Sequence, residues 1–421
     1  MPLFVLPIFS LLLSLSVQAQ PDLSGSWAMT AVDFGNPNTT RLVLKQDGDK
    51  LTGTLGNQKL EGTLAAMEFT FKAGGRTGTG KLLGGRLAGQ VTEWGRTLEW
   101  SAERIPQRPA LARTHTFEPT KFEMYFTSRV DPVLRIAPGD TVKTWSVGAD
   151  GVDAKGQRRA RGGNPQTGPF YVEGALPGDT LVVRVNRLRT NRSWAVSGSR
   201  VVSNALEPGH LAGLKWDESF NNRWTIDAAA GIARLEQPPD ALKDFTVPLR
   251  PMLGCVAVAP GGEVAVRTSD SWRFGGNMDY NELVEGTTVY LPVNHPGALL
   301  FLGDGHAAQG DGELTGDALE TSMDIEFTVD LIEGGGAGHP MFENAEYLIS
   351  LGVGGNLDQA MQMATSGILR WLQRDYKLTA SEASVVMGFA LKYDVADLVG
   401  TQVSIAAKLS KAALAKLRKV S

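Results

Sequence analysis

Apolar and polar residues alternate in short segments along the first quarter of the chain. Between Pro21 and Ile105, segments of about 4–9 residues such as LVLKQDG, EFTFKAG and TLEWSAERI are bounded by Gly, Asn or Asp. A period of two residues with frequent turn signals is typical of antiparallel strands joined by tight hairpins. We therefore predict a small antiparallel β-barrel or sandwich domain over residues 20–106.

The next stretch is rich in proline and basic residues and has no period, which predicts a linker at residues 107–113. A larger β-rich domain is expected over residues 114–421. In its segment TSMDIEFTVDLI, residues 321–332, apolar side chains alternate with acidic or hydroxyl ones. This alternation predicts a strand with one face buried.

The period becomes helical from about residue 340. Apolar residues at helical spacing predict one helix over residues 356–376 and a second over 379–399. Thr379, followed three residues later by Glu382, is an N-cap signal for the second helix. The predicted fold is thus mainly β with a C-terminal α-helical part, an α+β arrangement closed by two helices.

Composition supports a globular, turn-rich protein, with 42% hydrophobic residues, 20% charged residues and 49 glycines. The net charge of −4 gives no basic surface for nucleic acid, and the basic run GQRRARGG is interpreted as a solvated loop. The single cysteine, Cys255, lies in the apolar segment PMLGCVAVAP. We expect a small buried side chain there, because burial without a cationic neighbour disfavours the thiolate.

Residues 1–19, MPLFVLPIFSLLLSLSVQA, combine an apolar stretch with a small-x-small pattern ending at Ala19. This pattern predicts a signal peptide cleaved near Ala19, and hence a secreted or periplasmic protein. The apolar run is shorter than the roughly 20 residues of a membrane span, and we expect none elsewhere.

The loop GDGHAAQGDGE, Gly303 to Glu313, offers a concentrated set of reactive side chains. Asp304, His306, Gln309, Asp311 and Glu313 follow directly after the apolar run GALLFL. Carboxylate and imidazole groups in a glycine-rich loop suit a divalent metal ion or acid–base chemistry. On this stretch alone, an ordinary hydrogen-bonded loop with solvated acids is an equal alternative.

Longer motifs strengthen the first interpretation. The segments GGNMDYNEL, VYLPVNHPGALLFLGDGHAAQGDGE, NPQTGPFYVEGALPGD and VPLRPMLGCVAVAP resemble those of the acetamidase/formamidase family. The resemblance extends from about Thr114 to the C-terminus, and the first domain resembles the lipocalin-like β-domains of secreted bacterial proteins. Family membership implies hydrolysis of the carbon–nitrogen bond of small linear amides, giving a carboxylate and ammonia. The extra β-domain and the signal peptide depart from the family pattern and leave the physiological substrate open.

Amide hydrolysis needs an activated nucleophile, and a Gly/Ser-rich run with a paired lysine is absent from the sequence. We therefore predict water activated by a divalent metal ion, with zinc favoured and calcium, magnesium or manganese as alternatives. The predicted metal ligands are Asp279, His306 and Asp311, although Asp279 is equally well explained as a turn cap.

Glu173 is the predicted general base, because it ends the apolar strand TGPFYVEGA and is followed by small residues. It could equally hold the neighbouring glycine-rich backbone, and Glu313 is the second candidate base. Asn277 and Gln309 are the predicted substrate-binding amides, with loop stabilisation as their alternative role.

The expected partner is a small amide, and a homo-oligomer is compatible with the family resemblance. Two other functions stay open at this point. One is a non-catalytic envelope protein that binds ligands on the same fold, and the other is a hydrolase of a different small C–N compound.

Overall fold

The computed structural model describes residues 21–417, which form two compact units, one ending at Arg104 and the other beginning at Ile105. The predicted signal peptide lies outside the described residues. Within residues 21–417, helices are too short or too polar to cross a membrane. Each unit is described by itself.

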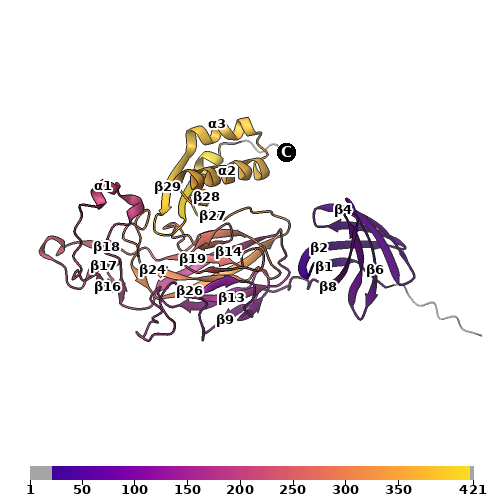
Figure 1. Ribbon diagram of the computed structural model, residues 1–421, viewed down its shortest axis with the longest axis horizontal. Helices are drawn as coiled ribbons and strands as arrows, with labels where there is room; N and C mark the ends of the chain where they lie inside the picture. Colours follow the sequence, from indigo (N-terminus) through magenta and orange to yellow (C-terminus); the bar gives the residue numbers. More distant parts are fainter. Residues whose placement is uncertain (1–20, 418–421) are drawn as a thin grey trace, which may run out of the picture. The chain divides into compact units, whose positions relative to one another are not determined.

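The first unit is a closed barrel of eight antiparallel strands in sequential order (Figure 1). Every strand pairs with its neighbour in sequence, and β1 closes the barrel against β8. The strands are β1 (Gly25–Asp33), β2 (Asn36–Asp47), β3 (Lys50–Leu55), β4 (Gln58–Ala65), β5 (Glu68–Ala73), β6 (Arg76–Leu83), β7 (Arg86–Glu93) and β8 (Arg96–Arg104). The predicted antiparallel meander is confirmed, and Trp27 is fully buried in the barrel core.

Two hairpin turns of this barrel carry exposed aromatic residues in a left-handed backbone conformation. Phe34 and Trp94 each occupy the first position of a two-residue turn, with φ of 49° at both. Their side chains are 87% and 86% exposed. Such turns favour Asn or Gly, since a bulky side chain at positive φ costs roughly 1–2 kcal/mol.

Replacing Trp94 with Asn is therefore expected to stabilise the barrel by about 1 kcal/mol. Urea unfolding followed by circular dichroism would measure the shift in midpoint. Gly95→Ala is the matched control, because Gly95 has φ of 77° in open space and its substitution adds strain alone. A loss of stability in Trp94→Asn would show that the indole is held by contacts that outweigh the backbone cost.

The second unit contains two large sheets. The first has eleven strands, with β24 (Leu300–His306) near its middle between β19 (Met252–Val258) and β25 (Glu320–Thr321). Its other strands are β11 (Leu134–Ile136), β13 (Gln166–Val172), β15 (Trp194–Val196), β16 (Arg223–Asp227), β17 (Ile232–Leu235), β18 (Thr246–Pro248), β21 (Ser271–Trp272) and β22 (Gly275–Asn277).

The second sheet has nine strands in the order β29-β30-β28-β27-β23-β14-β26-β12-β9. They are β9 (Thr114–Thr116), β12 (Thr141–Ser146), β14 (Thr180–Thr190), β23 (Thr288–Pro292), β26 (Met323–Ile332), β27 (Met341–Glu343), β28 (Tyr347–Gly354), β29 (Leu391–Asp397) and β30 (Val403–Ser410). A separate pair joins β10 (Tyr125–Thr127) to β20 (Ala265–Arg267). The predicted half-buried strand is confirmed as β26.

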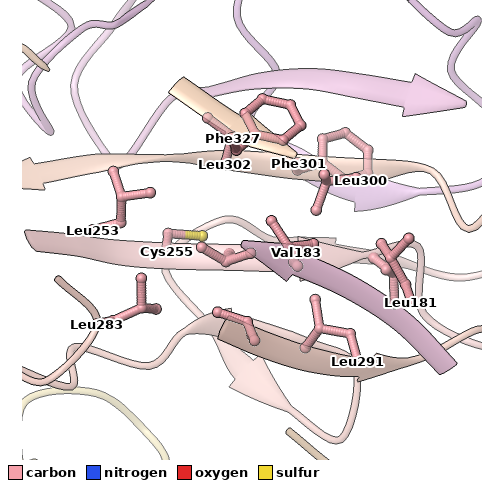
Figure 2. Close-up of a cluster of buried hydrophobic side chains, with 14 of the residues drawn as sticks. Leu181, Val183, Leu253, Cys255, Leu283, Leu291, Leu300, Phe301, Leu302 and Phe327 are labelled. Atoms are coloured by element: carbon pink, nitrogen blue, oxygen red, sulfur yellow. The ribbon is translucent and has the colours of Figure 1, made fainter. Parts of the chain in front are cut away.

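Apolar side chains from both sheets form one buried cluster (Figure 2). Leu253 and Cys255 of β19 join Leu181 and Val183 of β14 in this core. Cys255 is fully buried, and burial, with smaller contributions from Asp304 and Asp279, raises the pKa of its thiol. The expectation of an unreactive buried cysteine agrees with this setting, and β24 contributes Leu300, Phe301 and Leu302 to the same core.

Four helices are present among the described residues: α1 (Pro208–Leu211), α2 (Leu357–Asp375), α3 (Ala380–Ala390) and α4 (Lys411–Leu414), with 3-10 turns at Ser203–Ala205 and Asp240–Leu242. Helix α2 packs on β28 and β30 (Figure 1). The contact is close because Gly352 lacks a Cβ, which would overlap the carbonyl oxygen of Ala360. The predicted capping box of α3 is confirmed by hydrogen bonds between Thr379 and Glu382.

The prediction that two helices close the fold is wrong. Helix α3 ends at Ala390, and residues Leu391–Asp397 form β29, which pairs with β30. The segment LKYDVAD alternates apolar and polar residues, so its period of two was present in the sequence. Pairing with the edge of the second sheet outweighs the helical spacing there, because tertiary contacts override weak local propensity.

Candidate functional site

Strand β24 brings the predicted histidine into the interior of the first sheet. Its residues are all buried, and its last residue, His306, lies opposite Met252 of β19 and Glu320 of β25. The apolar run before the loop therefore continues into the sheet and carries Asp304 and His306 with it. Both side chains are at most 2% exposed.

Acidic residues from separate segments meet the histidine there. Asp279 follows β22, Glu313 lies in the loop after β24, and Glu320 belongs to β25; all are buried. Together with Asp304 and His306 they make up what we call the carboxylate cluster. From His306 Nε2, the distance is 3.1 Å to Glu320 Oε1, 3.4 Å to Asp304 Oδ1 and 3.9 Å to Asp279 Oδ1.

Gln309 sets the orientation of the imidazole ring. Its Nε2 donates to the carbonyl oxygens of Asp279 at 2.5 Å and Ala396 at 3.4 Å. Its Oε1 therefore faces His306 Nδ1, at 2.8 Å, and accepts a hydrogen bond from it. In the neutral ring Nδ1 is then the donor and the lone pair of Nε2 points among the carboxylates, an arrangement found in histidines that bind metal ions.

Two asparagines hold the carboxylates of the cluster in place. Asn164 Nδ2 donates to Asp304 Oδ2 at 2.9 Å and also to Asn277 Oδ1. Asn277 Nδ2 donates to Asp279 Oδ2. This chain of amides connects two acids that are 25 residues apart in the sequence, and it fixes their outer oxygens while leaving the inner ones free.

The inner atoms of the cluster have no hydrogen-bond partner within the described residues. They are Asp279 Oδ1, Asp304 Oδ1, His306 Nε2 and Glu320 Oε2, and Asn164 Oδ1 beside the cluster is also unpaired. Leaving a buried polar atom unpaired costs roughly 1–3 kcal/mol. Asp279, His306 and Glu313, and likewise Asp304, His306 and Glu320, offer donor atoms that all lie within 4.8 Å of one another. Such donors fit a divalent cation.

Burial and mutual repulsion perturb the acids of the cluster. Burial, with the charges of Glu313 and Asp304, raises the pKa of Asp279 well above its usual range. Burial likewise raises the pKa of Glu313, and it raises the pKa of Glu320 to about 7. Burial opposes protonation of His306, yet Glu320 and Asp304 raise its pKa well above the ordinary value. Without a cation, the cluster thus retains protons near neutral pH.

The backbone is also strained around the cluster. Asn164, Asp279, Asp304 and Glu313 have φ values of 69°, 40°, 59° and 49°, in the left-handed region. Residues held in such conformations cost of order 1–3 kcal/mol and are concentrated at functional sites. Opposite them, Gly254 of β19 leaves space that the acids fill, since a Cβ there would overlap Asp279 Oδ1 and Asp304 Oδ2.

A cavity of about 690 Å³ opens onto the cluster. Asn164, Asn277, Asp304, Glu313 and Glu320 form part of its lining. A substrate entering here would meet carboxylates and amide groups at the buried end. The arrangement can bind a cation, hold a polar group by hydrogen bonds, and exchange protons with it.

The structure brings together five of the seven side chains predicted for the site. Asp279, His306 and Glu313 belong to the carboxylate cluster, and Asn277 and Gln309 make hydrogen bonds to it. Each of these two amides already holds a cluster residue, and direct binding of substrate by either stays a prediction.

Glu173 and Asp311 lie elsewhere, and placing them in the site requires correction. Phe170 of β13 lies opposite Leu300 at the start of β24, so Glu173 extends past the end of β24 that is remote from His306. The stretch from Leu300 to His306 alone spans roughly 20 Å at 3.3 Å per residue, and Glu173 lies beyond it. Its carboxylate instead pairs with Arg135 at 3.0 Å. Asp311 is exposed, and its Oδ1 accepts a hydrogen bond from Asn281 at 2.7 Å.

Sequence reasoning missed Glu320, Asn164 and the place of Asp304 beside His306. Asp304 was noted in the loop, but alternation within a strand would have signalled that it shares a face with His306 two residues later. Asn164 opens one of the quoted family segments, NPQTGPF. Glu320 had no local signal, because only the pairing of β25 with β24 places it beside the histidine.

Comparison with known proteins supports the resemblance inferred from the motifs. Residues 260–351 match the profile of the Acetamidase/Formamidase family, a segment that contains Asp279, Asp304, His306, Glu313 and Glu320. The chain is 35% identical over 227 residues to the formamidase of Methylophilus methylotrophus, covering 42% of this chain and 54% of that protein. The chain spans about half the length of the curated relatives it matches.

Solved structures match over a longer part of the chain. The acetamidase of Yersinia enterocolitica has 26% identity and a TM-score of 0.61, and the match covers 72% of this chain and 93% of that one. A predicted acetamidase/formamidase from Thermoanaerobacter tengcongensis shares the fold, at 23% identity and a TM-score of 0.62, covering 73% and 99% of the two chains. The mainly β architecture predicted from the sequence is confirmed.

Proposed function

We propose, from the family match and the carboxylate cluster, that the protein hydrolyses the carbon–nitrogen bond of amides to a carboxylate and ammonia, using a divalent metal ion. The observation that carries this proposal is the set of unpaired donor atoms around His306 Nε2. This chain is similar to amide hydrolases, and its buried, unpaired acceptor atoms are best explained as partners for a cation and a substrate.

The residues that would hold the metal ion are His306, Asp279, Asp304 and Glu320. One imidazole with several carboxylates suits zinc, and calcium, magnesium or manganese are alternatives that the oxygen donors also accommodate. When bound, such an ion lowers the pKa of water and polarises a carbonyl group.

Glu313 is the proposed proton carrier. Its Oε1 accepts a hydrogen bond from the Ala318 N–H at 2.8 Å, which fixes the carboxylate at the wall of the cavity. Burial raises its pKa, so it can take a proton from the attacking water and deliver it to the leaving nitrogen. Delivery is required because an amide anion is too basic to leave unprotonated.

Asn164 and Gln309 are the proposed positioning residues. Asn164 holds Asp304, and its free Oδ1 can accept a hydrogen bond from the substrate NH₂ group. Gln309 holds His306 in the tautomer that leaves Nε2 available. We further propose export from the cytoplasm, on the basis of the signal-peptide pattern in residues 1–19.

The proposal predicts metal-dependent ammonia release. The purified full chain should release ammonia from formamide or acetamide, chelator should abolish the release, and an added divalent ion should restore it. Metal content measured before and after chelation is the control. A folded, metal-loaded protein that releases no ammonia from any amide would favour a ligand-binding role on the same fold instead.

A further inference from the structure

A second cavity lies beside the carboxylate cluster and is apolar. Its volume is about 730 Å³, and its walls come mainly from residues 220–250 and 308–319. Seven large apolar side chains in the first of these segments surround it: Phe220, Trp224, Leu235, Leu242, Phe245, Val247 and Leu249. Its base is the small hydrophobic core that joins β16 and β17 to Ala308 and Leu319.

This cavity and the polar one share a wall. Glu313 lines both, and Gln309, which orients His306, also lines the apolar cavity. A molecule in the apolar cavity can therefore contact Glu313, the residue that also lines the polar cavity.

The chemistry of the walls favours a hydrocarbon group. Ser197 Oγ donates to the Gly198 carbonyl and accepts from Trp224 Nε1, so its capacity is used within the protein. Thr315 Oγ1 donates to the Asp317 carbonyl, and Arg250 pairs with Glu282 at 2.8 Å. With these groups paired and apolar side chains making up most of the wall, the cavity stabilises a hydrocarbon group better than a polar one.

The size of the cavity is far beyond the needs of formamide or acetamide. Cavities of roughly 300–1,000 Å³ are typical of sites for drug-sized ligands. We infer that the substrates are amides that carry an aryl group or a medium-length alkyl chain, which binds in the apolar cavity while the amide binds at Glu313. This inference rests on the proposed amide hydrolysis and specifies its substrate class.

The test is the dependence of kcat/KM on chain length with the zinc-loaded full chain. Acetamide, butanamide, hexanamide and phenylacetamide form the acyl series and release ammonia. N-pentylacetamide places the pentyl group of hexanamide on nitrogen and would release pentylamine. Burial of each methylene is expected to raise kcat/KM about fourfold, or roughly 10²-fold from acetamide to hexanamide. The series in which kcat/KM rises, acyl-extended or N-alkylated, identifies which side of the amide enters the cavity.

Phe245→Ser tests the location of the group. Phe245 is 51% exposed at the rim and packs against Trp224, so its loss is tolerable to the fold. We expect the ratio of kcat/KM for hexanamide to that for acetamide to fall about tenfold. Phe389→Ser is the matched control, because Phe389 is 92% exposed on α3, and it should leave the ratio unchanged.

The outcomes separate the inference from the proposed function. Hydrolysis of acetamide with no gain in either series overturns the inference alone. If no amide is hydrolysed, the proposed function fails, and calorimetry tests the ligand class by itself. Binding of hexanamide with a negative heat-capacity change, weakened by Phe245→Ser, would support an apolar ligand in this cavity. Absence of binding would overturn the inference. If Phe245→Ser instead converts an oligomer to monomers and leaves the ratio unchanged, the cavity is an interface between copies and the inference is overturned.

Discussion

Replacing Glu313 with Gln is expected to lower kcat for amide hydrolysis by about 10²–10⁴-fold, the usual effect of removing a general acid–base group. The carboxylate is 6% exposed, and its Oε1 accepts the Ala318 N–H. A glutamine has the same shape and keeps that acceptor, so the fold should persist while proton transfer is lost. Steady-state kinetics with acetamide and hexanamide would measure the change.

Glu173→Gln is the matched control for this substitution. It makes the same chemical change at a carboxylate that pairs with Arg135 at the far end of β24. Its activity should equal that of the wild type, and an equal loss in both variants would restore Glu173 as the base. Metal content distinguishes the roles of Glu313: a variant that also loses its metal ion would mark Glu313 as a ligand.

A bound divalent ion is expected to raise the Tm of the second unit by roughly 8 °C. At a free metal concentration about 1,000 times Kd, binding stabilises the native state by about 4 kcal/mol, and a unit of this size shifts by about 2 °C per kcal/mol. The physical cause is neutralisation of the buried carboxylates, whose inner oxygens lack partners. Thermal unfolding with and without chelator would measure the shift.

Asp304→Asn should abolish this response and raise the Tm of the metal-free protein. One buried negative charge is removed, the shape is kept, and asparagine tolerates the φ of 59° at this position. Asp311→Asn is the matched control, because its carboxylate is exposed and bonded to Asn281. If Asp311→Asn lost the metal response and Asp304→Asn kept it, the ligand set would be the one predicted from the sequence.

The same cluster fixes the sign of the pH dependence of stability. The pKa of Glu320 is about 7 in the fold and near 4.5 in the unfolded chain, so the folded state holds more protons between these values. The contribution of this group to the stability of the metal-free protein should therefore be fully present at and below about pH 4.5, and it should be lost as the pH rises through about 7. A bound metal ion would take the place of those protons, so the loss of stability with rising pH should disappear in the metal-loaded protein.

The amino-acid pattern predicted the parts of the fold that depend on local periodicity. Strand alternation identified the barrel and β26, and the Thr379 capping box located the start of α3. It failed at Leu391, where pairing with β30 decides the conformation. A period of two and a helical stripe coexist in that segment, and only the partner strand selects between them.

The candidate site was predictable where its residues lie within one loop or one motif. His306 and Glu313 were found because the glycine-rich segment after an apolar run concentrates imidazole and carboxylate groups within a few residues. Glu173 was misplaced because the end of an apolar strand carries no information about which neighbour it reaches. The register of β13 against β24, set by contacts far apart in the sequence, sends it away from His306.

The pairing of distant strands in the second sheet has a consequence for biosynthesis. Strand β12 pairs with β26, so Thr141 cannot form its pair until Thr328 has been synthesised. In the barrel, each strand pairs with the one made just before it, and only the closure of β1 on β8 joins strands distant in sequence. Non-local pairing delays folding, and domains generally fold as units in the order of their synthesis. The barrel can therefore be complete on the nascent chain while the second unit is still an unfolded polypeptide, and His306 cannot meet Glu320 before about three-quarters of the chain has been made.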